Sequence, residues 1–196
     1  MPERKERADA VRNREAVLAA ADSLFARSDS PRSVSMDDVA AAAGVGKGTL
    51  FRRFGDRTGL IHALYEARIQ PVREAVESGP APLGPSTPPH ERVPALLDAV
   101  LGFKLDNRHL ALALEESGSG SPYAAGHYAW WHRTVKETLE RIPSAPTAAF
   151  TAHALLAATR ADLVEHLTGE LNTTPEQMRQ DLADYTARVL GRRGNG

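Results

Sequence analysis

The sequence predicts an all-α protein in which a small three-helix head precedes a larger helical bundle. Three observations support this class. Apolar residues recur at the spacing of one helix face along most of the 196 residues. Stretches rich in glycine and proline divide these patterns into segments of helical length. Finally, the stretch from Ser35 to Phe54 carries the signals of two short helices joined by a tight turn.

Composition limits the classes of function that we expect. Hydrophobic residues make up 42% of the chain, which is sufficient for a core, whereas aromatic residues at 6% are too few for a sugar- or base-stacking surface. The absence of cysteine excludes disulfides, thiolate nucleophiles and cysteine-ligated zinc, and is compatible with a reducing cytoplasm. No apolar stretch of about 18 residues and no signal-peptide pattern is present. We therefore expect a cytoplasmic protein with no membrane partner.

The chain is expected to begin with a charged arm and one helix. Residues 1–9 include Arg4, Lys5 and Arg7 and are interpreted as a flexible terminus. Ser28–Ser33 is a predicted turn. Between these segments, a helix of about four turns has an apolar face. This face consists of Val17, Leu18, Ala21, Leu24 and Phe25.

Capping signals define the first short helix of the central stretch. Ser35 is a suitable N-cap, and Asp38, three residues later, can reach back to the cap and interact with the positive end of the helix dipole. Gly44 ends the helix because glycine adopts the left-handed C′ conformation without steric cost. A second short helix is expected to start at Gly46 or Lys47.

The second short helix has an apolar face and a basic face. Leu50 and Phe54 share the face that packs on the head, and the basic side chains point elsewhere. A helix of about two turns that presents a basic face beside a tight turn is typical of the helix that reads the major groove of DNA. We therefore interpret this face as a candidate DNA-binding surface, although the net charge of the chain is −1.

The same stretch resembles the DNA-binding signature of the TetR family of bacterial one-component repressors. The resemblance begins at Arg14–Phe25, which is similar to the first helix of the family. It continues through Val39–Ala40 and Ala43–Phe54, and it closes with Asp56–Leu60, the usual opening of the fourth helix. It covers roughly the first third of the chain, and its parts occur in the family's order.

Three residues depart from the family pattern. Gly46 stands where serine is common, Phe51 replaces a tyrosine whose hydroxyl often touches phosphate in relatives, and Arg53 replaces a frequent histidine. The resemblance implies a homodimer that binds a palindromic operator in double-stranded DNA. It also implies release by a small-molecule effector that binds in the C-terminal core and moves the fourth helix.

The candidate DNA contacts lie at the ends of three helices. Lys47 and Thr49 are expected at base edges, and Arg52 and Arg53 at the sugar–phosphate backbone. The full candidate set is Ser35, Gly46, Lys47, Gly48, Thr49, Phe51, Arg52, Arg53 and Thr58. Ser35 and Thr58 belong to it because amides at a helix start bind phosphate. A basic arm in residues 1–9 that reaches an adjacent groove is the alternative to a flexible terminus.

The domain boundaries follow the breaks in helical pattern. We assign residues 1–55 to the DNA-binding head, 56–77 to a connecting helix, 78–90 to a loop rich in proline and glycine, and 91–196 to a helical domain for ligand binding and dimerisation. Pro71 predicts a kink or a break in the connecting helix near Gln70.

Within the C-terminal domain, the patterns predict helices over residues 93–107, 110–116 and 123–142, a long helical stretch over 147–171, and a last helix that begins at 175. Ser117–Ser121 is a predicted flexible linker without the G-x-S-x-G order of a hydrolase nucleophile.

Surplus apolar surface on the last two helices predicts a homodimer. Between Ala148 and Ala158 the chain is apolar nearly all round, so this helix needs a partner on two sides. Small residues there let a second backbone approach. The predicted interface residues are Ala154, Ala157, Ala158, Leu182, Tyr185 and Val189.

A small apolar effector is expected to bind among aromatic and polar side chains of the C-terminal domain. The candidate residues are Phe103, Leu114, Tyr123, His127, Trp130, Trp131, His153 and Arg160. Simple core packing or a place in an interface is the alternative for each of them. His127 and His132 are five residues apart, which does not align them for metal, so we expect neither a metal nor another cofactor.

The sequence thus predicts a ligand-responsive transcriptional regulator of the repressor type. Two alternatives remain at this point. One is a helical adaptor that no longer binds DNA, which Phe51 and the nearly neutral head would fit. The other is an enzyme on a helical scaffold, which is disfavoured because the sequence contains no recognisable set of nucleophile, base and acid.

Overall fold

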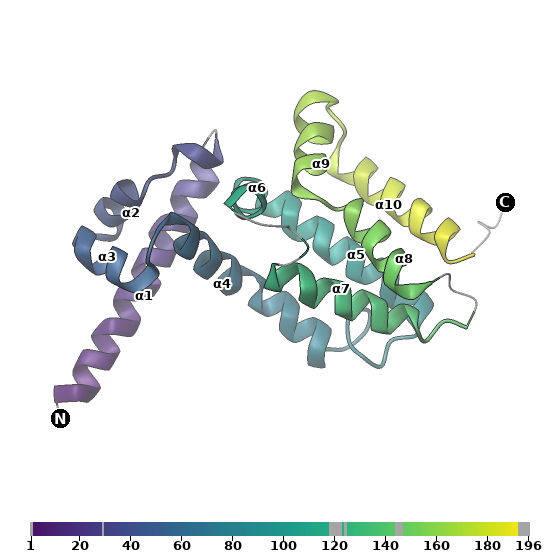
Figure 1. Cartoon of the computed structure of the whole chain (residues 1–196), viewed down its shortest axis with the longest axis horizontal. Helices are drawn as coiled ribbons and strands as arrows, with labels where there is room; N and C mark the ends of the chain where they lie inside the picture. Colours follow the sequence, from purple (N-terminus) through teal and green to yellow (C-terminus); the bar gives the residue numbers. More distant parts are fainter. Residues whose placement is uncertain (1, 29, 118–122, 124, 144–146, 192–196) are drawn as a thin grey trace. The chain divides into compact units, whose positions relative to one another are not determined.

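The computed structural model describes residues 2–28, 30–117, 123, 125–143 and 147–191, and these ranges contain helices and no strand (Figure 1). The predicted all-α class is therefore confirmed. The chain packs into two compact units, residues 1–68 with 109–117 and residues 69–108 with 118–196. Over the described ranges, no helix is long and apolar enough to cross a membrane.

The first unit is a helical head. It contains α1 (Pro2–Arg27), α2 (Met36–Ala43), α3 (Lys47–Phe54), the first turns of α4 (Arg57–Ser78) and nearly all of α6 (Arg108–Ser117). Its core combines the predicted face of α1 with apolar side chains of the next three helices. The core residues include Val17, Leu18, Ala21, Phe25, Val39, Ala40, Leu50, Leu60, Ile61 and Leu64.

The N-terminal segment differs from the prediction. Residues 2–9, expected as a flexible arm, are helical and form the first turns of α1. The segment has Pro2 at the first helical position, where the missing N–H is no loss, followed by glutamate, lysine, arginine and alanine, all good helix formers. Helix α6 lies with the head, although its place in the sequence assigned it to the domain of residues 91–196.

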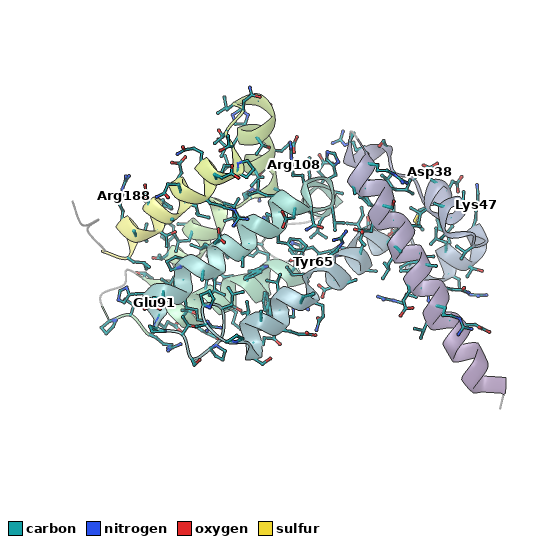
Figure 2. The ribbon with its side chains drawn as sticks, turned by 180° about the vertical axis from the view of Figure 1, so that it is seen from behind. Asp38, Lys47, Tyr65, Glu91, Arg108 and Arg188 are labelled. Atoms are coloured by element: carbon teal, nitrogen blue, oxygen red, sulfur yellow. The ribbon has the colours of Figure 1, made fainter. Side chains whose placement is uncertain are left out.

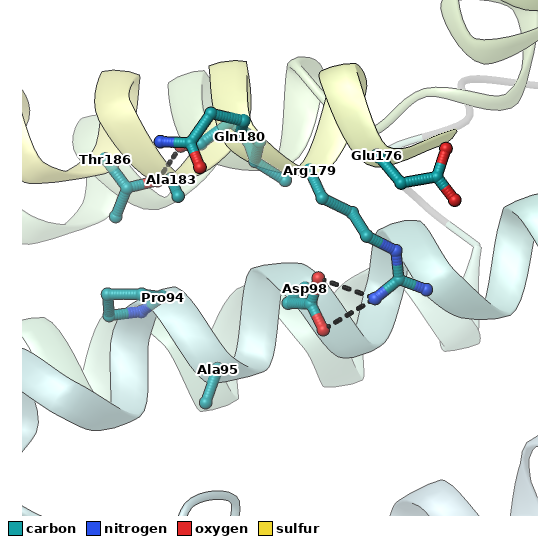
Figure 3. Close-up of a pocket in the computed structure, with 9 residues that line it drawn as sticks. Pro94, Ala95, Asp98, Glu176, Arg179, Gln180, Ala183 and Thr186 are labelled. Atoms are coloured by element: carbon teal, nitrogen blue, oxygen red, sulfur yellow. Dashed lines mark hydrogen bonds and ion pairs between the residues drawn. The ribbon is translucent and has the colours of Figure 1, made fainter. Parts of the chain in front are cut away.

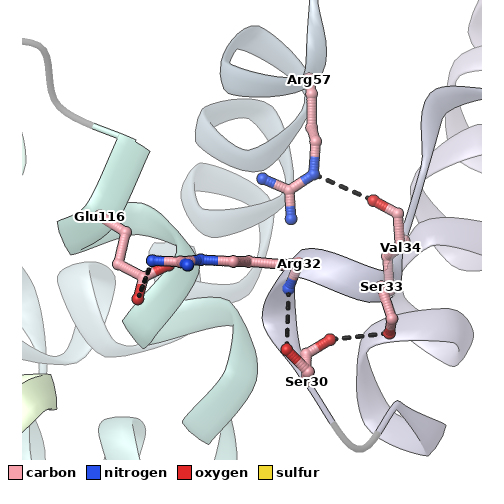
Figure 4. Close-up of polar contacts among 6 residues, drawn as sticks. All are labelled: Ser30, Arg32, Ser33, Val34, Arg57 and Glu116. Atoms are coloured by element: carbon pink, nitrogen blue, oxygen red, sulfur yellow. Dashed lines mark hydrogen bonds and ion pairs between the residues drawn. The ribbon is translucent and has the colours of Figure 1, made fainter.

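Polar contacts hold the short segment between α1 and α2 (Figure 4). The 3-10 turn η1 (Pro31–Ser33) is capped by Ser30, whose hydroxyl accepts from the backbone N–H of Arg32 at 3.3 Å. The Arg32 guanidinium lies 3.3 Å from Glu116 of α6. Arg57 of α4 donates from Nε to the carbonyl oxygen of Val34 at 2.9 Å. These contacts join the segment to both α4 and α6.

The second unit is built around α5 (Pro89–Asp106), which contacts α7 (Gly126–Leu139), α9 (Ala161–Glu165) and α10 (Pro175–Val189). Helix α8 (Ala148–Ala157) packs against α7, and a π-helical turn, η3 (His166–Glu170), follows α9. Because α5 lies inside this unit, it is apolar on several sides. Its buried residues include Val93, Leu96, Leu97, Val100, Leu101 and Phe103.

One buried arginine fixes the loop of residues 79–88 between α4 and α5. Arg92 is only 9% exposed, and its guanidinium donates to the carbonyl oxygens of Val76 and Leu83, each at 2.9 Å, and to the hydroxyl of Thr138 at 3.4 Å. Thr87 of the loop is itself buried. The segment that the sequence assigned to a loop rich in proline and glycine is therefore packed against its own unit.

The structure tests two predictions about where helices are interrupted. Helix α4 continues through Pro71, so of the kink or break predicted near Gln70, the break is excluded. Pro71 and Ala67 are both exposed, so water can satisfy the carbonyl that loses its partner. The stretch from 147 to 171 is interrupted between Ala157 and Ala161.

The interruption has a local cause. The buried Thr159 bonds back to the carbonyl oxygen of Leu156 through both its N–H and its hydroxyl, at 3.1 and 2.9 Å, which competes with helical bonding. Ser117 is the last residue of α6, and the rest of the predicted linker Ser117–Ser121 lies outside the described residues.

Candidate nucleic-acid interface

The start of α2 has the predicted reciprocal cap. The hydroxyl of Ser35 accepts from the backbone N–H of Asp38 at 3.2 Å, and the Asp38 carboxylate accepts from the backbone N–H of Ser35 at 3.2 Å. The hydrogen bonds from the Ser35 hydroxyl and from its backbone lower the pKa of the Asp38 carboxyl. This cap fixes the direction in which α2 enters the head.

The turn that follows sets the angle between α2 and α3. Gly44 has φ +65°, the left-handed conformation that the sequence predicted for this position. The N–H of Gly44 donates to the carbonyl oxygen of Ala41, and that of Val45 to Ala40 at 3.1 Å. Two carbonyls at the end of α2 are thereby satisfied, and α3 begins at Lys47, as expected.

Helix α3 separates apolar and basic side chains as predicted. Leu50 is 1% exposed and anchors the helix in the head, whereas the opposite side is open to solvent. The exposed residues of α3 are Lys47, Gly48, Phe51, Arg52 and Arg53, and Thr49 is half-buried. Lys47 stands at the first position of the helix (Figure 2). The candidate side chains thus share one accessible surface.

Two basic side chains of this surface contact other helices of the head. The ammonium of Lys47 lies 2.5 Å from a carboxylate oxygen of Asp37 in the first turn of α2. The guanidinium of Arg53 donates to the carbonyl oxygen of Ala10 in α1. Neither contact was predicted, because each joins residues that are far apart in sequence.

An open groove of about 570 Å³ runs between α1 and α3. It is lined by Asp9, Ala10, Asn13, Thr49, Arg52 and Arg53. Asn13 was not predicted as a site residue, since only the packing of α1 against the reading helix brings its amide near the basic residues. Amide, hydroxyl and guanidinium groups at one groove are donors suited to a phosphate backbone.

The start of α4 lies next to the end of α3. Asp56 accepts from the backbone N–H of Gly59 at 2.8 Å and caps α4, while Thr58 sits half-buried one residue inside the helix. A Cβ on Gly59 would lie 1.9 Å from the carbonyl oxygen of Phe54, so only glycine permits this approach. Thr58 is therefore not the capping residue, and phosphate binding there would involve its amide.

The predicted effector residues are divided between the two units. Phe103 and Trp131 are buried in the second unit, whereas Leu114 belongs to the first unit. Trp130 donates from Nε1 to Glu77 at 3.0 Å, and the guanidinium of Arg73 lies 5.0 Å from its ring centre.

Two other predicted effector residues, Arg160 and His127, have different surroundings. Arg160 is paired with Asp162 at 2.8 Å. His127 is half-buried on α7. Neither residue lines either of the two grooves along α10.

Tyr123 and His153 instead belong to an aromatic cluster completed by Tyr128 and His132. The rings of His132 and His153 stack with centres 3.9 Å apart, and the Tyr128 hydroxyl lies 2.5 Å from Nδ1 of His153. The Tyr123 ring meets the rings of Tyr128 and His153 edge-on. Partial burial and the neighbouring His132 lower the pKa of His153. Across the residues that the structure describes, no group of three or more potential metal ligands is assembled.

A groove of about 490 Å³ lies between α5 and α10, and none of the predicted effector residues lines it. Figure 3 shows the Arg179 guanidinium reaching across this groove to Asp98, with N–O distances of 2.9 and 3.0 Å. Leu182, a predicted interface residue, lines the same groove and is buried within its own unit.

The other predicted interface residues differ in exposure. Tyr185 and Ala157 are exposed, and Ala154, Ala158 and Val189 are half-buried. Phe150 of α8, which was not among the predicted interface residues, is 73% exposed. Helices α8 and α10 therefore present apolar surface outward at two of the predicted positions, Tyr185 and Ala157, and also at Phe150.

Comparison with known proteins places the head in one family. Residues 17–64 match the bacterial regulatory proteins of the tetR family. The HTH-type transcriptional regulator SAR0097 of Staphylococcus aureus (strain MRSA252) is 28% identical over 119 residues, which span 61% of this chain and 62% of that regulator.

Solved structures share the fold over most of their length. A TetR-like transcriptional regulator from Rhodococcus sp. RHA1 has 22% sequence identity and a TM-score of 0.64, covering 92% of this chain and 97% of that one. Another transcriptional regulator from Rhodococcus sp. Rha1 has 17% sequence identity and a TM-score of 0.69, and the match covers 91% of this chain and 96% of that one. NalD of Pseudomonas aeruginosa is the secondary repressor of the MexAB-OprM multidrug efflux pump. It has 17% sequence identity and a TM-score of 0.62, and the match covers 93% of this chain and 97% of that one.

These relatives are transcriptional regulators and not enzymes, and the family match covers the capped helix-turn-helix described above. The head of the chain, over residues 17–64, therefore belongs to the tetR family of bacterial regulatory proteins.

Proposed function

We propose that the protein is a cytoplasmic transcriptional repressor that binds a palindromic DNA operator as a homodimer and is released from it by a small-molecule effector. The observation that carries this proposal is α3. A helix of two turns is anchored by one buried residue, Leu50, and exposes Lys47, Arg52 and Arg53 beside a capped turn. A basic, accessible helix in this position fits the major groove.

The proposed contacts divide into two kinds. Lys47 and Thr49, in the first turn of α3, are placed to meet base edges, which carry sequence information. Arg52, Arg53 and the newly recognised Asn13 line the groove between α1 and α3 and would hold the sugar–phosphate backbone. One short helix reads few bases, so a two-fold dimer on a palindrome would double the contacts.

The proposed dimer uses the outward faces of α8 and α10. Phe150 and Tyr185 are exposed apolar side chains on these helices, and Ala157 offers a small residue beside them. Light scattering of the full chain should give the mass of two chains, and Phe150→Glu should shift it toward one. A wild-type mass of one chain at all concentrations would contradict the dimer.

The proposed effector site lies in the second unit, near the aromatic side chains of α7. Helix α4 has residues in both units, so a ligand that shifts α4 relative to α7 could change how the two heads of a dimer fit the operator. Both tryptophans of the chain, Trp130 and Trp131, lie on α7. Quenching of their fluorescence by small apolar molecules that also release DNA would identify the effector class.

DNA binding is tested with genomic fragments, including the region upstream of the coding sequence, across a salt series. The wild type should bind a few fragments saturably, and binding should weaken steeply with salt because phosphate contacts release counterions. Lys47→Ala and Arg52→Ala should each weaken operator binding by about tenfold or more. Arg133→Ala, which removes a positive charge from the exposed side of α7, is the matched control and should have little effect.

The contacts of Lys47 and Arg53 with the head also fit an adaptor that has kept the fold without reading DNA. Such a protein would show only weak, sequence-independent binding, and Lys47→Ala would leave its cellular function unchanged. Saturable binding to selected fragments therefore decides between the two functions.

A further inference from the structure

The ion pair between Asp37 and Lys47 lies beside the cap of α2, where the Asp37 carboxylate also faces the positive end of the helix dipole. Asp37 is the second residue of α2, but the cap of this helix is formed by Ser35 and Asp38. Both side chains of the pair are mostly exposed, Lys47 at 65% and Asp37 at 59%. Exposed pairs of this kind contribute little to stability. The carboxylate therefore calls for an explanation at the surface that α3 presents.

The position of the carboxylate matters for what Lys47 can bind. Its ammonium has three N–H donors, and one is directed to Asp37 at 2.5 Å. The remaining donors are free to meet neutral acceptors, such as O6 and N7 of guanine in the major groove. A phosphate within reach of the ammonium would also lie a few ångströms from the Asp37 carboxylate, and the two negative charges would repel each other.

We propose that Asp37 is a specificity-determining residue that directs Lys47 to a guanine edge and away from the phosphate backbone. This inference rests on the proposed function and goes beyond it, because it assigns a role to an acidic residue that touches no phosphate. The pair lowers the affinity of the head for DNA in general. It leaves intact the contact that depends on sequence, so it raises the ratio between operator and non-specific binding.

The test compares the full-length wild type, Asp37→Asn and Glu15→Gln on two duplexes. One duplex is selected from a random pool by the wild type, and the other is its shuffled sequence. Asp37→Asn keeps the shape of the side chain and removes the charge. Glu15→Gln removes the same charge from the exposed side of α1 and serves as the matched control. Fluorescence polarisation across a salt series gives affinity and salt slope.

Asp37→Asn should bind the shuffled duplex about threefold more tightly or better, with a salt slope steeper by about 0.9, the value of one additional phosphate contact. Its preference for the selected duplex should fall by a similar factor. The guanines of the selected duplex can be replaced by 7-deazaguanine, which lacks the N7 acceptor. Replacement at one position should weaken binding of the wild type, and the same replacement should weaken binding of the Lys47→Ala variant less.

Four results would overturn the inference. Asp37→Asn could change affinity and slope no more than Glu15→Gln does, which would make the pair a surface contact only. It could weaken binding to both duplexes together with the thermal stability of the head, which would make Asp37 structural. A wild type that binds no duplex would overturn the proposed function as well. A wild type that discriminates, with an unchanged preference in Asp37→Asn, would overturn this inference alone.

Discussion

The two units of this protein contain sharp changes of chain direction that are held in opposite ways. Between α2 and α3, the bonds that form the turn join near neighbours, as from the N–H of Val45 to Ala40. Between α4 and α5, the loop is held by Arg92, whose acceptors lie 9 and 16 residues earlier and 46 residues later. The first turn is specified by local sequence and the second by tertiary packing, so they should respond differently to mutation.

The largest effect is expected from Arg92→Met in the second unit. This change leaves the carbonyl oxygens of Val76 and Leu83 without their donor in a buried place, which should lower the free energy of unfolding by about 4 kcal/mol. Urea denaturation followed by tryptophan fluorescence reports this unit specifically, because both tryptophans lie on α7.

The control for Arg92 is Arg141→Met. Arg141 donates to Pro85 of the same loop at 3.2 Å but is exposed, so its loss should cost no more than about 0.5 kcal/mol. Equal effects of the two variants would mean that the loop is not held by the buried guanidinium.

The head also depends on tertiary packing, and Leu50→Ala measures one part of it. Leu50 is buried at 1% exposure and docks α3 on the head, so its truncation should destabilise this unit by about 3 kcal/mol. Hydrogen exchange of α2 and α3 should accelerate, while the tryptophan transition of the second unit stays unchanged. Phe51→Ala, on the exposed side of the same helix, should have little effect on exchange, and a matching acceleration would contradict the assigned faces.

This contrast explains which parts of the fold could be predicted. The cap at Ser35 and the left-handed Gly44 depend on residue types at fixed short spacings, and both were predicted correctly. The interruption after Ala157 was missed, because Thr159 gives no signal in sequence comparable to glycine or proline. The clamp at Arg92 was missed as well, since nothing near it in sequence marks its acceptors.

The same distinction applies to the candidate site. Lys47, Arg52 and Arg53 were identified from the periodicity of one helix, and they lie on its exposed side as expected. Asp37 and Asn13 reach the surface from α2 and α1, and only packing brings them to α3. The effector residues were chosen by chemical type, and type alone does not determine which side chains meet.

Acidification should lower the stability of the two units in different pH ranges. In the second unit, the pKa of His153 is lowered in the folded state. As the pH falls below the ordinary range of histidine, about 6.5, the unfolded chain therefore binds more protons than the folded chain. Stability of the α7–α8 region should therefore decrease from there downward. In the head, the pKa of Asp38 is lowered, so its contribution is present above the ordinary range of a carboxyl and is lost only at lower pH.

Tryptophan fluorescence and hydrogen exchange, recorded in urea at a series of pH values, would show the second unit weakening first. His153→Gln should flatten this part of the profile and leave the head unchanged. A wild-type profile that is flat between neutral pH and the carboxyl range would contradict this role of His153, because its lowered pKa in the folded state is the reason for the expected loss of stability.

The smallest and most local prediction uses one substitution at two glycines of the same turn. Gly46 has φ −67°, no side-chain cap on α3 and no atom within 4 Å of the position that a Cβ would occupy, so Gly46→Ser should add a cap and stabilise the head by about 0.3 kcal/mol. Gly44 also has open space but φ +65°, so Gly44→Ser should destabilise the head by about 1 kcal/mol. Hydrogen exchange of α3 measures both. Because steric room is equal at the two sites, opposite signs would show that backbone conformation alone specifies this turn, whereas equal signs would mean that contacts beyond the turn contribute to it.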